Sequence, residues 1–104
     1  MVVDMLLKLG VDISHLEMHT RKSLRSVEVI FENSGAAEPV ITSTYEGNHS
    51  VSSLHYQNRA YDLRLPFKTI KMNREVVKHL RSNLENGFDI ILERTHIHIA
   101  YDPK

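Results

Sequence analysis

The chain has no cysteine among its 104 residues. Disulfides and thiolate metal sites are therefore excluded, and any metal must be bound by histidine, aspartate or glutamate. There is no excess of either charge, since thirteen basic residues balance thirteen acidic ones. This balance predicts neither nucleic-acid binding nor adhesion to an acidic membrane. No apolar run is long enough to cross a bilayer, so we expect no membrane insertion.

Residues 1–8 also lack the basic region and the apolar stretch of a secretory signal peptide. We therefore expect synthesis in the cytoplasm, with separate release if the protein acts at the cell wall. The length predicts one domain over residues 1–104, large enough to bury a modest core without cross-links.

Apolar residues at helical spacing predict a first helix over residues 12–34. Ser14 is the expected N-cap and Glu17, three residues later, would complete a capping box. Gly35 is expected to end the helix. A second helix is expected to begin with Asn73 as its cap and to end at Gly87.

Alternating or β-rich segments predict four strands, over residues 39–45, 59–65, 88–93 and 96–101. Together with the helices they predict an α+β fold, in which two helices pack on one face of a small, mostly antiparallel sheet. If Arg94 and Thr95 form a two-residue hairpin loop, Glu93 faces His96 and Ile91 faces His98. Glu93, His96 and His98 would then share one face of the sheet. The other face would carry the core residues Phe88, Ile90, Leu92, Ile97, Ile99 and Tyr101.

Two short segments contain the side chains that could bind a metal. His55 and Asp62 lie seven residues apart, and His96 and His98 flank Ile97. One carboxylate and three imidazoles are enough to give zinc three protein ligands and leave one position open for water. Without the metal, the simplest interpretation of Asp62 is a carboxylate paired with an arginine at the sheet surface, and that of His55 is a loop histidine.

Residues 47–62, 87–90 and 96–98 together resemble a known superfamily. It contains the zinc D-Ala-D-Ala carboxypeptidases, phage endolysin peptidases of the same type and the signalling domain of hedgehog. The resemblance implies a hedgehog-like or D-Ala-D-Ala-peptidase-like fold and one zinc ion per chain, held by His55, Asp62 and His98. It also implies a peptidoglycan peptide as substrate, which would suit a phage or prophage product.

The same resemblance assigns roles to the neighbouring residues. His96 would lie beside the metal and stabilise the developing oxyanion, although the reverse assignment of His96 and His98 stays open. Peptidase members often carry an acid three residues before the last ligand, where this chain has Thr95. Glu93 is therefore the candidate general base, and the alternative is a surface acid paired with Arg94 or Arg59.

Substrate-binding candidates lie before the first ligand. Related peptidases have an arginine there, but no arginine occurs between residues 39 and 58. His49 could replace it, or could be a solvated loop histidine. Ser53 can shape the ligand loop through local hydrogen bonds. Asn58 stands where relatives usually have glycine and should tolerate a left-handed backbone.

Three functions are compatible with these residues. The first is a zinc metallopeptidase that hydrolyses peptidoglycan peptide bonds, of D-Ala-D-Ala carboxypeptidase or endolysin type. The alternative is a non-catalytic, zinc-containing binding module of hedgehog type, which the acid missing at Thr95 favours. A non-proteolytic metal hydrolase is a third idea. We expect the remaining histidines, His15, His19 and His79, to be surface residues.

Overall fold

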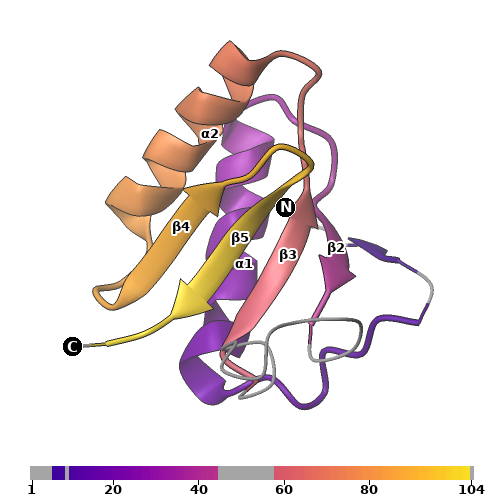
Figure 1. The fold of residues 1–104 in the computed structure, drawn as a ribbon. Helices are drawn as coiled ribbons and strands as arrows, with labels where there is room; N and C mark the ends of the chain where they lie inside the picture. The colour runs from indigo at the N-terminus through magenta and orange to yellow at the C-terminus, as the bar shows by residue number, and fades with distance from the viewer. Residues whose placement is uncertain (1–5, 9, 45–57, 104) are drawn as a thin grey trace.

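The computed structural model describes residues 6–8, 10–44 and 58–103, which form two helices and five strands (Figure 1). The elements in chain order are β1 (Leu6–Leu7), α1 (Met18–Asn33), β2 (Val40–Ser43), β3 (Ala60–Arg64), α2 (Ile70–Asn83), β4 (Phe88–Leu92) and β5 (His96–Tyr101). The sheet has the order β1-β2-β3-β5-β4, in which only the β1–β2 pair is parallel. The predicted α+β architecture with a mostly antiparallel sheet is confirmed.

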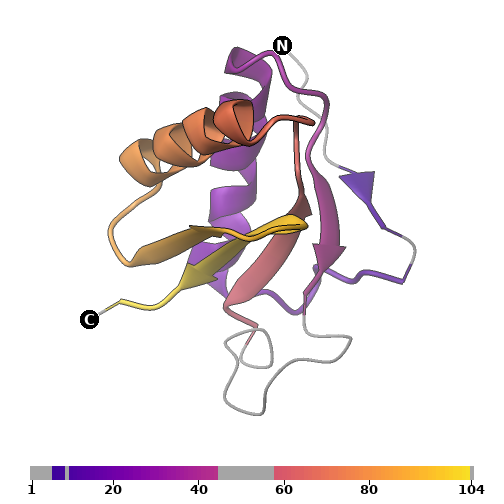
Figure 2. The same ribbon diagram turned by 45° about the horizontal axis from the view of Figure 1, so that its top comes forward.

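Both helices lie on the same side of the sheet (Figure 2). The core between them holds the apolar residues of alternate strand positions, because successive side chains of a strand point to opposite faces. Fully buried members include Tyr61 and Leu63 on β3 and Ile97 and Ile99 on β5. The intervening residues of these strands therefore point away from the helices, as the alternation in the sequence predicts.

The first helix begins later than predicted. Ser14 is not its cap, because the helix begins at Met18. The backbone N–H of Ser14 is instead bonded to the Asp12 carboxylate at 2.8 Å in a separate turn. Glu17 is the N-cap itself, and its carboxylate accepts from the Thr20 N–H at 2.8 Å. A glutamate at this position satisfies a free N–H of the first turn as a serine would, and its charge suits the positive end of the helix dipole.

The end of α1 is as predicted. Gly35 has φ +76°, a left-handed conformation that glycine adopts without steric cost. Its N–H bonds to the Glu32 carbonyl at 3.1 Å, and the Ala36 N–H bonds to the Phe31 carbonyl at 3.0 Å. This pair of hydrogen bonds is the Schellman motif, which satisfies carbonyl groups that the helix end would otherwise leave unpaired.

The second helix also begins and ends at other residues than predicted. Thr69 is its N-cap, accepting from the Met72 N–H, while Asn73 lies inside the helix and is buried. The Asn73 amide instead clamps the preceding loop, with 2.9 Å bonds to both the N–H and the carbonyl of Phe67. The helix ends at Asn83, and Gly87, with φ +102°, forms the turn into β4.

The predicted hairpin register between β4 and β5 is confirmed. Ile91 pairs with His98, and the Glu93 N–H donates to the His96 carbonyl at 2.8 Å. The strand predicted over residues 39–45 corresponds to the shorter β2, and the two-residue strand β1 had no predicted counterpart. None of the described helices has the length and apolar character needed to cross a membrane.

Candidate functional site

Asp62 lies in the middle of β3 on the face of the sheet that the helices leave uncovered. Its residue partner on β5 is His98, directly opposite. The Nδ1 of His98 lies 3.0 Å from Oδ1 of Asp62, so the imidazole donates to the carboxylate. The Asp62 carboxylate is largely buried, although it is on a sheet face without a helix above it. Two residues that are 36 positions apart in sequence thus form a polar pair across two central strands.

His96 reaches the same carboxylate from the next outward-facing position of β5. Its Nε2 lies 3.7 Å from Oδ1 of Asp62, and its Nδ1 lies 3.0 Å from the Thr95 hydroxyl. The strand partner of His96 on β3 is Arg64. The described side-chain contacts of Asp62 are nevertheless with His96 and His98, and not with Arg64. The interpretation of Asp62 as a partner of Arg59 or Arg64 therefore finds no support in the described contacts.

An irregularity in the neighbouring strand lies next to Asp62. The β2–β3 pairing runs from Ile41 with Leu63 to Ser43 with Asp62, so β2 carries one extra residue, Thr42. The Thr42 hydroxyl lies 3.4 Å from the backbone carbonyl of Asp62. Bulges of this kind bend a strand and re-aim side chains, and they are frequent beside functional sites.

The Asp62–His98 pair suits two positions of a zinc site. Carboxylate oxygen and imidazole nitrogen are both zinc donors, and two ligands of a tetrahedral zinc lie about 3.3 Å apart. The observed 3.0 Å separation is close to that value. Within residues 6–8, 10–44 and 58–103, however, no group of three or more His, Asp or Glu side chains is arranged to hold a metal. A third ligand would have to come from elsewhere in the chain.

Three of the predicted site residues, His49, Ser53 and His55, lie outside the described residues. The residue that follows this segment is Asn58, whose φ of 60° confirms the expected left-handed backbone. The Asn58 carbonyl accepts from the Glu17 N–H at 2.8 Å, which ties the start of β3 to the start of α1. The backbone that enters the Asp62 strand is therefore anchored to the N-terminus of α1.

The candidate base Glu93 is exposed at the end of the β4–β5 hairpin. Its side chain lines a groove between α2 and β4, and it forms no hydrogen bond or ion pair with another described residue. Neither Arg59 nor Arg94 is paired with it among those residues. The structure thus brings Asp62, His96 and His98 together but does not bring the Glu93 carboxylate into contact with them.

A second carboxylate–histidine pair lies at the start of α1 and was not predicted. His19 Nδ1 lies 2.8 Å from the Glu17 carboxylate, and its ring stacks on Tyr101 with centroids 4.6 Å apart. Burial alone would raise the pKa of Glu17, but hydrogen bonds from His19 and Thr20 outweigh it and lower the pKa to about 2. The spacing Glu17-x-His19 was visible in the sequence, but nothing there indicated that Tyr101 would cover the imidazole. As expected, His15 and His79 are exposed at the surface, and His19 is partly exposed there beside Tyr101.

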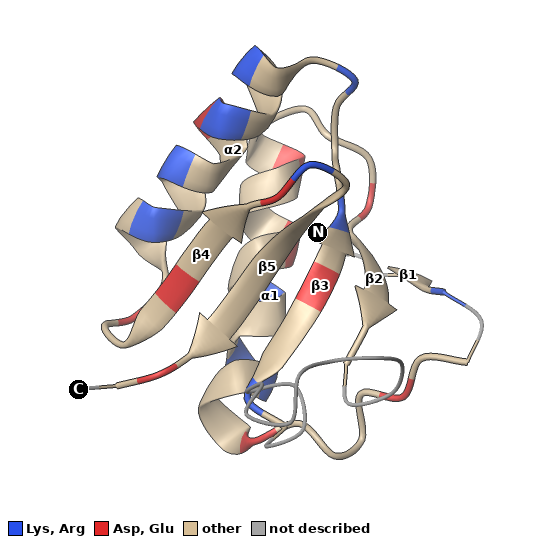
Figure 3. Ribbon diagram, in the orientation of Figure 1, with Lys and Arg blue, Asp and Glu red and all other residues tan. Residues whose placement is uncertain are grey.

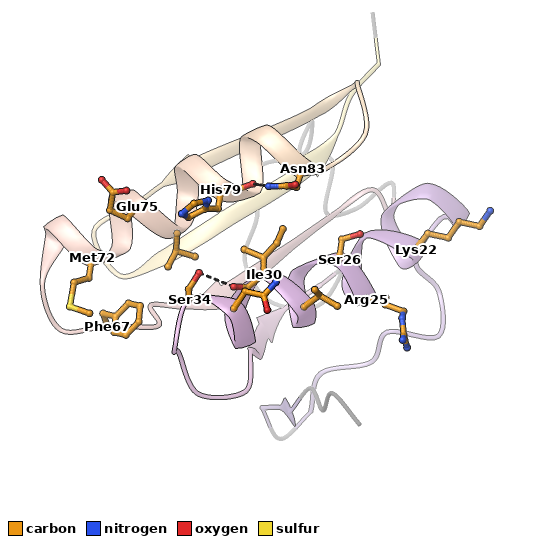
Figure 4. A pocket seen from close by; sticks show the side chains of 13 residues that line it. Lys22, Arg25, Ser26, Ile30, Ser34, Phe67, Met72, Glu75, His79 and Asn83 are labelled. Carbon is orange, nitrogen blue, oxygen red and sulfur yellow. Dashed lines mark hydrogen bonds between the residues drawn. The ribbon is translucent and has the colours of Figure 1, made fainter. Parts of the chain in front are cut away.

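A larger hollow, of about 840 Å³, lies between α1 and α2 on the other side of the molecule (Figure 4). Its lining includes the apolar residues Ile30 and Phe67 and the charged residues Lys22, Arg25 and Glu75. It contains His79 but no carboxylate–histidine pair among its described contacts. Its position on the helical face separates it from the Asp62–His98 pair, which the sheet places on the opposite face.

No protein-family model, curated protein or solved structure matches this chain. The contacts of Asp62, His96 and His98, and the sequence pattern around them, are the features of the chain that bear on its function.

Proposed function

We propose that the protein is a zinc metallopeptidase that hydrolyses peptidoglycan peptide bonds. The observation that supports this most is the contact between the Asp62 carboxylate and the His98 imidazole on the open face of the sheet. The family resemblance in the sequence names the same two residues as ligands of one zinc ion. The resemblance of residues 47–62 and 96–98 to zinc D-Ala-D-Ala peptidases supplies the substrate class.

The proposed ligands are His55, Asp62 and His98, of which His55 is included on its sequence spacing alone. When bound, zinc polarises the scissile carbonyl and lowers the pKa of water. Asp62 supplies the only anionic ligand, and its position opposite His98 fixes both donors on rigid strands. Such support matters because the productive geometry of a site tolerates errors of only about 0.5 Å.

His96 is the proposed oxyanion donor. In this proposal the Thr95 hydroxyl, 3.0 Å from Nδ1, donates to it, and the ring carries its proton on Nε2, the nitrogen on the side of Asp62. An N–H there can donate to the oxygen of the substrate carbonyl as negative charge develops on it. Because His98 is the closer of the two histidines to Asp62, the geometry favours His98 as ligand and His96 as its neighbour.

Proton transfer is assigned to Glu93. In this scheme its carboxylate accepts a proton from the attacking water and passes it to the leaving amine. This requires the Glu93 side chain to reach the site when substrate is present, since it contacts none of Asp62, His96 or His98 in the structure. Catalytic hydrogen bonds often form only in the substrate complex.

A non-catalytic zinc-binding module is the second candidate, and one observation favours it. Thr95, at the position where peptidases often carry their acid, is occupied in a hydrogen bond with His96. A threonine hydroxyl cannot serve as the base at neutral pH. In such a module zinc would stabilise the fold or bind a partner, and no substrate would be hydrolysed.

Two measurements on the purified chain test the proposal. Elemental analysis should give one zinc per chain in the wild type and in His79→Ala, an exposed histidine on α2. His98→Ala and Asp62→Asn should each lose most of the bound zinc. A full zinc content in both variants would refute the assigned site. Release of peptides from purified peptidoglycan, abolished by a chelator and restored by zinc, would support the peptidase. Zinc-loaded protein without turnover would instead support the binding module.

A further inference from the structure

The charged residues that line the groove between α2 and β4 are mostly positive. Arg74, Lys78 and Arg81 line it from α2, and Arg94 lines it from the β4–β5 hairpin. Glu93 is the only acidic residue among the described residues that line it. The chain as a whole is neutral, so these four cations represent a local separation of charge.

The cations of α2 follow one face of the helix. Lys71, Arg74, Lys78 and Arg81 are spaced three, four and three residues apart, which keeps them on one side at 3.6 residues per turn. They extend along about 15 Å of the helix axis, at a rise of 1.5 Å per residue. Figure 3 shows the basic residues on successive turns of α2 and again in the loop that joins β4 to β5.

One of these cations is fixed in place by the fold. Nε and Nη2 of Arg81 both donate to the Ile90 carbonyl, at 3.1 and 2.7 Å. The guanidinium has five N–H donors, so three remain for a ligand. Holding one cation at the wall of the groove lowers the entropy that a ligand must remove on binding.

We propose that this groove binds a linear phosphodiester polymer that carries no nucleobases, such as a polyol-phosphate chain. A row of cations along a groove matches charges repeated along a chain better than it matches one phosphate. Three of the four lining cations are arginines, whose planar guanidinium suits phosphate oxygens. The described lining includes no aromatic side chain, so nothing there would stack on bases as single-stranded nucleic-acid binders do.

Apart from Asn73 and Glu93, the remaining lining of the groove is aliphatic. Ile70 and Ile91 are exposed there, with 63% and 45% of their surface accessible. They can pack against the carbon backbone of a polyol while the cations contact its phosphates. Of the residues assigned to the zinc site, Asp62, His96 and His98 do not line the groove and Glu93 does. The proposed contacts to phosphate come from the four cations and do not use the Glu93 carboxylate.

The test is binding of a synthetic glycerol-phosphate oligomer, long enough to span α2, to the full chain by isothermal titration. With about four phosphate contacts, affinity should fall roughly 50-fold between 50 and 200 mM salt. The double variant Arg74→Glu/Lys78→Glu should bind about tenfold more weakly or worse. The matched control is Lys22→Glu/Arg25→Glu, which changes the net charge equally at exposed positions of α1 and should bind as the wild type does. Circular dichroism checks that both variants fold.

Other occupants would give different results. Equal loss in both double variants would overturn the proposal, because affinity would then follow net charge and not this groove. Tighter binding of a single-stranded oligonucleotide of equal charge would overturn it in favour of nucleic acid. Binding to vesicles of anionic phospholipid without binding to the oligomer would overturn it in favour of a membrane surface.

Discussion

Asp62 and His98 stand directly opposite each other on β3 and β5, with a carboxylate oxygen 3.0 Å from an imidazole nitrogen. The contact depends on strand register, because a shift of one residue would turn Asp62 toward the core. That register is fixed by the buried neighbours on either side, Tyr61 with Ile99 and Leu63 with Ile97. The apolar core on one face therefore determines the polar geometry on the other.

His96→Ala should keep its zinc and lose activity under the proposed function. Nε2 of His96 lies farther from Asp62 than Nδ1 of His98, as expected for a donor beside the metal. Loss of one oxyanion donor costs about 100- to 1000-fold in kcat. Steady-state kinetics on a peptidoglycan peptide, with zinc content measured on the same sample, tests whether activity is lost while zinc is retained. A zinc-free His96→Ala beside a zinc-loaded His98→Ala would show that the two roles are exchanged.

Glu93→Gln separates the enzyme from the binding module. The amide has the shape of the carboxylate but cannot accept a proton as a base, so the variant should fold and bind zinc normally. Its rate should fall by about 100-fold or more if Glu93 is the base. Equal rates for wild type and variant would exclude Glu93 and direct the search to His49. Asp89→Asn, at an exposed acid within β4, controls for the loss of one negative charge.

Much of the fold was predictable because the apolar periodicity is strong. The face assignment of β3 and β5 followed from alternation alone, and the hairpin register followed from loop length. Helix starts were not predictable, because Glu17 and Asn73 each had two possible roles. Glu17 caps the helix that Ser14 was expected to cap, and Asn73 clamps Phe67 instead of capping a first turn. Only tertiary contacts decide between such alternatives.

For the site, the sequence identified the residues that meet but not all of their contacts. The proximity of Asp62 and His98 was expected from the resemblance, whereas the bulge at Thr42 and the Thr95–His96 bond had no signal in the sequence. The basic face of α2 was visible as a regular spacing. The net charge of the chain gives no sign of it, since acidic residues elsewhere balance these cations.

The two faces of β4 can be compared by truncating adjacent residues. Ile90 is 5% exposed and faces the core, whereas Ile91 is 45% exposed on the opposite face. Ile90→Ala should lower the free energy of unfolding by about 2–5 kcal/mol. Ile91→Ala should lower it by about 0.5 kcal/mol or less. Urea denaturation measures both, and similar losses would contradict the assignment of faces.

Tyr61 should make the protein sensitive to alkali. Burial raises its pKa well above the ordinary value of 10.0, against the smaller opposing effect of its 2.6 Å hydrogen bond with Ser23. The unfolded chain therefore loses this proton at lower pH than the folded chain, and stability falls as pH rises through about 10. Tyr61→Phe should cost about 0.5–1.5 kcal/mol at neutral pH and make that fall shallower. Denaturation midpoints measured from pH 8 to 11, with Tyr101→Phe as control, would show whether burial of Tyr61 has this effect.

The contribution of Glu17 to stability should change in the acidic pH range, in contrast to that of Tyr61. Its pKa is held at about 2, against an ordinary 4.5, so the folded state binds fewer protons than the unfolded state between these values. The stabilisation from Glu17 is therefore complete above about pH 4.5 and disappears as pH falls toward 2. Glu17→Ala removes the N-cap of α1 and should cost about 1 kcal/mol at pH 7. The difference between wild type and variant should shrink through the acid window, whereas Glu32→Ala, at an exposed position of the same helix, should show no such convergence. A difference that stays constant from pH 7 to 2 would mean that the cap contributes through packing and not through the charge of the carboxylate.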